Sequence, residues 1–132
     1  MHGEVDLNVL LRTMEPVLHS SAFVFHSSAL SFADALTYDP ILLFKENEGT
    51  ALILKKEKAD DEGLNYHYMS RMITLNVHSS LEAVGFLAAI TTHLAKAGIS
   101  VNPVSAHFHD HLFVPEERAN DAMHILNNIK QE

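Results

Sequence analysis

The sequence predicts an α+β protein made of two βαββα units, the first of them degenerate, with antiparallel sheets. Two observations indicate this fold class. The second half of the chain reads strand, helix, strand, strand, helix, and the first half repeats part of that order around a clear hairpin. The order divides the chain into units 1–70 and 71–132. A lone βαββα unit lacks a strand for a four-stranded sheet, so we expect merged sheets, or strands shared between units or between chains.

The first part of the chain predicts a helix and then a strand. Apolar residues spaced for one helical face favour a helix over residues 4–14, and Pro16 ends it. The run SAFVFH at 21–26 is typical of a short apolar strand. Residues 27–39 have no clean period, so a short helix and an ordered loop are both open there.

A hairpin follows. The apolar runs ILLFKE and TALILK are separated by Asn47-Glu48-Gly49, and two such runs around a short glycine-containing turn predict paired strands. The charged residues 56–62 favour a short surface helix closed by Gly63. A last strand of this half is expected near Tyr66.

The second half has stronger signals. Residues 72–77 alternate apolar and polar, which predicts a half-buried strand. Ser79 and Glu82 fit a capping box, so we expect a helix from there to about Ala97. Its core stripe would consist of Ala83, Leu87, Ile90, Leu94 and Ala97.

The chain should end in a hairpin and a helix. Gly98 closes the preceding helix, and residues 99–108 read as a strand that Pro103 assigns to an edge or bulge. We expect His109-Asp110 to form the turn and 111–114 the return strand. Pro115 then opens a final helix, whose stripe is Ala119, Ala122, Leu126 and Ile129.

Composition excludes several function classes. The net charge of −8 makes nucleic acid and anionic membrane surfaces poor partners. With no cysteine, the chain has no disulfide, thiolate nucleophile or cysteine-ligated metal. No apolar run is long enough for a membrane span, and no signal peptide is evident, so we expect a cytoplasmic protein. No motif indicates a resident cofactor.

The stretch 77–105, with Gly85-Phe86-Leu87 at its helix start and Gly98 before an aliphatic strand, resembles the ACT regulatory domain. The closing stretch 104–115 resembles the ACT subgroup of aspartate kinases and CASTOR-type arginine sensors, with Asp110 at the hairpin turn. The chain resembles the paired-ACT group called DUF2241 or ACT_3, most strongly over about 72–130, more weakly over 40–64 and least over 1–39. The resemblance implies a ferredoxin-like fold, side-by-side sheet pairing and amino acids as the ligand class.

The expected ligand site lies at the loop before the long helix. Backbone amides at a helix N-terminus can receive a carboxylate, and Asp110 or Glu82 can receive an ammonium group. Each residue also has a structural alternative: Ser79 and Ser80 as helix caps, Gly85 as a packing position and Asp110 as a turn former. The predicted ligand-binding residues are His78, Ser79, Ser80, Leu81, Glu82, Val84, Gly85, Phe86, Asn102 and Asp110.

Two other chemistries are weaker. His107, His109 and His111 alternate and would share a face of a straight strand, which could hold zinc or nickel, but a turn at Asp110 breaks the alternation. Ser79 or Ser80 with His78 and Asp110 could form a triad only with a geometry that adjacent residues rarely have.

The sequence therefore predicts a regulatory module without catalysis. It would bind an amino acid or similar small metabolite and form a homodimer or higher homo-oligomer. The alternative is an assembly module that has lost ligand binding and presents Val84 and Phe86 to a partner.

Overall fold

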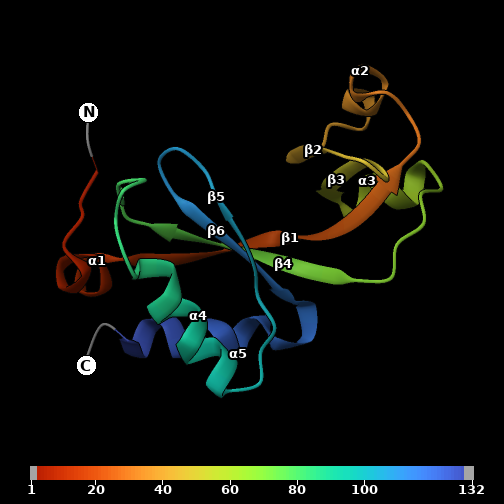
Figure 1. Ribbon diagram of the computed structural model, residues 1–132. Helices are drawn as coiled ribbons and strands as arrows, with labels where there is room; N and C mark the ends of the chain where they lie inside the picture. Colours follow the sequence, from red (N-terminus) through yellow and green to blue (C-terminus); the bar gives the residue numbers. More distant parts are fainter. Residues whose placement is uncertain (1–2, 130–132) are drawn as a thin grey trace. The chain divides into compact units, whose positions relative to one another are not determined.

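The computed structural model describes residues 3–129, and within them the strands form one six-stranded sheet in the order β2-β3-β1-β4-β6-β5 (Figure 1). The two central strands are the first strands of the two βαββα halves, so the expected merging of the sheets is confirmed. The elements in chain order are α1 (Leu7–Thr13), β1 (Glu15–Ser28), α2 (Phe32–Ala35), the 3₁₀ turn η1 (Leu36–Tyr38), β2 (Leu42–Glu46), β3 (Gly49–Lys55), α3 (Lys56–Asp61), β4 (Met69–Asn76), α4 (Phe86–Lys96), β5 (Asn102–Ser105), β6 (Asp110–Pro115), the 3₁₀ turn η2 (Glu116–Arg118) and α5 (Ala119–Ile129).

The described chain packs as two compact units. The larger unit combines residues 3–19 with 71–129, and the smaller unit consists of residues 20–70. Strand β1 contributes to both units, since the division between them falls within it, after His19. It is 14 residues long and extends well beyond the predicted run 21–26. The polar stretch His19-Ser20-Ser21 hides the continuity of this strand in the sequence.

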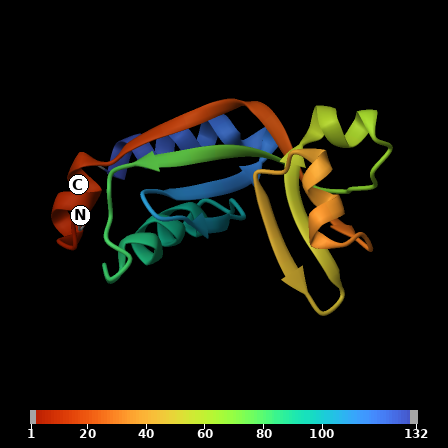
Figure 2. The same cartoon turned by 90° about the horizontal axis from the view of Figure 1, so that it is seen from above.

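The larger unit has its core between the sheet and its helices. Both α4 and α5 lie on one face of β4 and β6 (Figures 1 and 2). Ile90 and Leu94 of the predicted α4 stripe are fully buried, but Ala97 caps the helix and is exposed. The predicted stripe of α5 is confirmed in full, since Ala119, Ala122, Leu126 and Ile129 are all buried.

The smaller unit contains the predicted hairpin. Strands β2 and β3 pair antiparallel with Glu46 opposite Gly49, and Gly63 closes α3 as expected. The undecided segment 27–39 forms the single turn α2, capped by Ser31, followed by η1. No strand forms near Tyr66; its hydroxyl instead donates a hydrogen bond to the Asp60 carboxylate of α3 (2.6 Å), and β4 begins three residues later.

The start of α4 and the last hairpin turn differ from the expectation. Helix α4 begins at Phe86 behind Gly85, and no capping box forms at Ser79, because that hydroxyl donates to Asp110. Ala83 therefore lies in the loop before the helix. The hairpin turn spans residues 106–109, closed by the Ala106 amide and the His109 carbonyl, and Asp110 is already the first residue of β6.

Leu94 tests the packing of α4 against the sheet. Its side chain is fully buried, so Leu94→Ala should lower the free energy of unfolding by about 2–5 kcal/mol through lost burial and the cavity left behind. Val84→Ala, at a residue 85% exposed, is the control and should change it by less than about 0.5 kcal/mol. Urea unfolding followed by circular dichroism measures both. Equal losses would contradict the described core.

Candidate functional site

A cavity of about 170 Å³ lies in the larger unit, lined by the loop 77–85, the start of α4 and the β5–β6 hairpin. Figures 1 and 2 show the ribbons of these three segments. Pockets for drug-sized ligands occupy roughly 300–1,000 Å³, so this one suits a smaller molecule. Its walls combine serine hydroxyls, one carboxylate and small apolar side chains. The lining residues are Ser79, Ser80, Leu81, Ala83, Gly85, Phe86, Leu87, Ala88, Ser105, Ala106 and Asp110.

Asp110 is the one acidic residue in this wall, and it is only 7% exposed. The strand register places it directly opposite Ser105, whose hydroxyl donates to its Oδ1 at 2.6 Å. The Ser79 hydroxyl donates to Oδ2 at 3.3 Å from the loop before α4. A buried carboxylate is stable only with such partners, and it still has lone pairs for a cationic group.

The second polar feature is the N-terminus of α4. Gly85 occupies the N-cap with φ +91°, and no side chain caps the helix there. The first intrahelical bond runs from the Ala89 amide to the Gly85 carbonyl. The residues of the first turn, Phe86, Leu87 and Ala88, line the cavity. A helix of 11 residues with uncapped first-turn amides favours an anionic group at this end.

Six of the ten predicted ligand-binding residues line the cavity, namely Ser79, Ser80, Leu81, Gly85, Phe86 and Asp110. The other four lie elsewhere. The His78 ring packs on Phe108 with 5.2 Å between centroids, and Asn102 stands opposite Phe113 on an exposed position of β5. Glu82 and Val84 are exposed loop residues.

Of the two residues that the assembly alternative assigned to a partner, only one is exposed. Val84 is 85% exposed, as expected, but Phe86 is 3% exposed and belongs to the core. Sequence reasoning missed five lining residues: Ala83, Leu87 and Ala88 around the start of α4, and Ser105 and Ala106 of the last hairpin. The signal for the two hairpin residues was the register: a turn at 106–109 places Ser105 opposite Asp110, whereas the expected turn at Asp110 did not.

The histidine and triad hypotheses find no support in residues 3–129. No group of three histidine or acidic side chains in this range is arranged to hold a metal ion. His107 lies in the turn with its ring against Phe108, while the His109 and His111 rings stand 6.4 Å apart. Ser79 hydrogen-bonds to the Asp110 carboxylate itself, without an intervening imidazole.

A different histidine pair is joined across the sheet of the larger unit. The Thr74 hydroxyl of β4 hydrogen-bonds to His19 Nε2 of β1 (2.8 Å) and to His111 Nδ1 of β6 (2.9 Å). Its neighbours Ile73 and Leu75 are in the core, so this network lies on the face away from α4 and α5. Partial burial lowers the pKa of His111, and the nearby His109 and His19 lower it further against the opposing effect of Asp110.

Comparison with known protein families identifies the family of this chain. The ACT_3 model of the ACT domain matches residues 2–71 and the ACT_7 model matches residues 69–128. The chain belongs to the ACT domain family. The chain is similar to a Vibrio cholerae protein of unknown function, described as a possible transport protein, whose crystal structure is known. The two sequences are 42% identical and the structures align with a TM-score of 0.87, over 95% of this chain and 96% of that one.

Two more distant structures share the ACT fold. The regulatory subunit of aspartate kinase from Thermus thermophilus has a TM-score of 0.67 at 10% identity, over 90% of this chain and 97% of that chain. Clostridium acetobutylicum aspartate kinase has a TM-score of 0.69 at 12% identity, over 97% of this chain and 36% of that one. No curated protein sequence matches the chain. Among the described residues, no helix has the length and apolar character to cross a membrane.

The His111 network predicts that this ACT protein loses stability in mild acid. An unfolded histidine titrates near 6.5, so below that pH the unfolded state binds more protons than folded His111, whose pKa is lowered, and folding weakens. The melting temperature should fall between pH 7.5 and 5.5, and less steeply for His111→Gln. His67→Gln, at an exposed loop position, serves as the control. An unchanged slope for His111→Gln would sink this account.

Proposed function

We propose that this ACT protein is a sensor that binds one small amino acid in the cavity between the loop 77–85, α4 and β6, and that it performs no catalytic step of its own. One observation carries the proposal. A buried carboxylate, Asp110, and the uncapped N-terminus of α4 line the same cavity of about 170 Å³. These are the receptors that a free amino acid requires for its two charged groups.

Each group of the ligand has a complementary partner. The ammonium group donates to Asp110, in competition with the Ser79 hydroxyl, whose bond of 3.3 Å is the weaker of the two at that carboxylate. The carboxylate accepts from the first-turn amides of α4 and gains from the helix dipole. Leu81, Ala83 and Leu87 offer an apolar wall to a short side chain.

The N-terminal repeat lacks this pair of receptors. The burial patterns of β3 and β6 match when Leu52 and Leu54 are aligned with Leu112 and Val114, which places Thr50 at the position of Asp110. The Thr50 hydroxyl donates to the Leu30 carbonyl, and the Ser31 side chain caps α2. At the two positions that match Asp110 and Gly85, the N-terminal repeat therefore has an uncharged residue and a capped helix of four residues, and neither supplies the corresponding receptor. We therefore infer one ligand per chain.

The similarity to regulatory subunits of aspartate kinase supports a role in which ligand binding is read out by another protein or by another copy of the chain. We propose a homodimer or higher homo-oligomer that works in the cytoplasm. Strand β2 is an edge of the sheet, and its Phe44 is 64% exposed, which favours assembly through the smaller unit.

Calorimetry with Asp110→Asn tests the sensor. The unaltered protein is first screened against the twenty amino acids by thermal shift, where a ligand at 100 times its dissociation constant adds about 2.7 kcal/mol of stability. Asp110→Asn keeps the shape of the side chain but removes its charge. We expect it to weaken binding of the responding amino acid by about 2–5 kcal/mol, roughly 30-fold or more.

Asn102→Ala is the matched control, because Asn102 lies outside the cavity lining and its loss should leave affinity unchanged. Circular dichroism establishes that each variant is folded. Equal weakening in both variants would count against the site. A screen without any response would refute the sensor, and if Phe44→Glu then dissociated an oligomer, the assembly module would be the better account.

A further inference from the structure

The N-terminal residues of the described chain lie against the loop that forms the cavity wall. The Glu4 amide donates to the His78 carbonyl at 2.8 Å, and the Ser80 amide donates to the Glu4 carbonyl at 2.8 Å. These two bonds form a parallel β-bridge between Glu4 and Ser79. They fix the backbone of the one loop residue whose hydroxyl reaches Asp110.

Gly3 makes this close approach possible. A Cβ atom at Gly3 would lie 2.6 Å from the Ser80 amide nitrogen and 2.7 Å from both the His78 carbonyl oxygen and the Ser79 carbonyl carbon. All three are backbone atoms, so no side-chain rotation could relieve the contact. The φ of Gly3 lies outside the left-handed region, so the position excludes other residues by lack of space alone.

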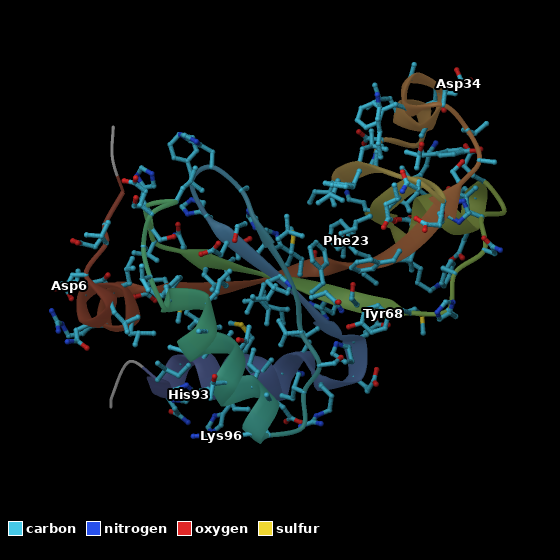
Figure 3. All side chains as sticks on the ribbon, in the orientation of Figure 1. Asp6, Phe23, Asp34, Tyr68, His93 and Lys96 are labelled. Carbon is cyan, nitrogen blue, oxygen red and sulfur yellow. The ribbon has the colours of Figure 1, made fainter. Side chains whose placement is uncertain are left out.

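The same segment is anchored to the core at its other end. The Glu4 carboxylate accepts from the amides of Val5 and Asp6, and Asp6 caps α1 by accepting from the Val9 amide. Figure 3 shows Asp6 beside α1. In α1, the fully buried Leu10 ties the helix to the core. Leu7 lies beside Gly85, with its Cδ2 3.7 Å from where a Cβ of that glycine would stand.

We propose that residues 3–7 form a strap that holds the loop 77–85, and that Gly3 and Glu4 are positioning residues of the ligand cavity. The strap hydrogen-bonds to the loop at His78 and Ser80, and its Leu7 side chain lies beside Gly85 at the other end of the loop. With the strap displaced, His78 and Ser80 lose their backbone bonds to Glu4, so Ser79 between them is no longer held beside Asp110, and the wall opposite β6 opens. The inference deepens the proposed function and rests on it for the identity of the ligand.

Gly3→Ala is the direct test. The added methyl carbon cannot be accommodated against the backbone of residues 78–80, so the strap must move away. In the variant we expect the Ser80 amide to exchange with deuterium at least tenfold faster, because its acceptor is the Glu4 carbonyl. The amide resonances of Ser79 and Asp110 should shift as well. These readouts need no ligand.

Affinity is then measured by calorimetry with L-alanine, L-serine and L-threonine, and Gly3→Ala should bind the responding probe at least tenfold more weakly. Gly98→Ala is the matched control. It adds the same methyl group in open space at a φ of +74°, so it strains the backbone at the far end of α4 without touching the strap. It should leave both Ser80 exchange and affinity unchanged.

Unchanged Ser80 exchange in Gly3→Ala would overturn the strap. Faster exchange with unchanged affinity would overturn its positioning role, as would an equal loss of affinity in Gly98→Ala. If the unaltered protein binds none of the probes, this result contradicts the proposed function but not the strap. The strap is then tested by Ser80 exchange and by the Ser79 and Asp110 resonances alone.

Discussion

The hydrogen bonds to the Asp110 carboxylate are the interaction on which the loop before α4 and the β5–β6 hairpin depend. A charge that is 7% exposed must be satisfied by the structure around it, and two serine hydroxyls do so, one from the facing strand and one from the loop before α4. The bond to Ser105 sets the last pair of the β5–β6 hairpin. The bond to Ser79 connects the loop before α4 to the first residue of β6. Because Ser79 is engaged in this way, the helix starts six residues after Ser80, with an uncapped N-terminus.

The two repeats show how one fold can keep a site and lose it. They share the order of elements and the burial pattern of their third strands. Where the C-terminal repeat has Asp110 and the uncapped Gly85, the N-terminal repeat has Thr50 and the capping Ser31. Its loop closes on itself through backbone and hydroxyl bonds. The two halves therefore differ in the charges they offer, rather than in their architecture.

Much of this fold follows from local patterns. The hairpin of the smaller unit, the C-terminal end of α4 at Gly98 and the stripe of α5 depend on neighbouring residues alone, and all were predictable. The start of α4 was not. Ser79 and Glu82 have capping-box spacing, but the Ser79 hydroxyl is taken by a carboxylate 31 residues away, and no local pattern reveals such a competitor.

The candidate site, like the fold, was predictable where it depends on local patterns and not where it depends on long-range contacts. The helix-start residues follow from the ACT-like pattern, and six of ten expected residues line the cavity. Asn102 was assigned by resemblance and lies on the outer edge strand, opposite Phe113. Ser105 required the correct hairpin register. The packing of residues 3–19 against the C-terminal half is a long-range contact, and the sequence has no periodic signal for it.

The most direct test of the central claim, one amino-acid site per chain at Asp110, is a titration of ¹⁵N-labelled protein with L-alanine, L-serine and L-threonine followed by NMR. The account predicts saturation at one ligand per chain, with amide shifts at residues 86–88, Ser105 and Asp110 and none at Ser31 or Thr50. Two ligands per chain, or shifts centred on Thr50, would contradict it.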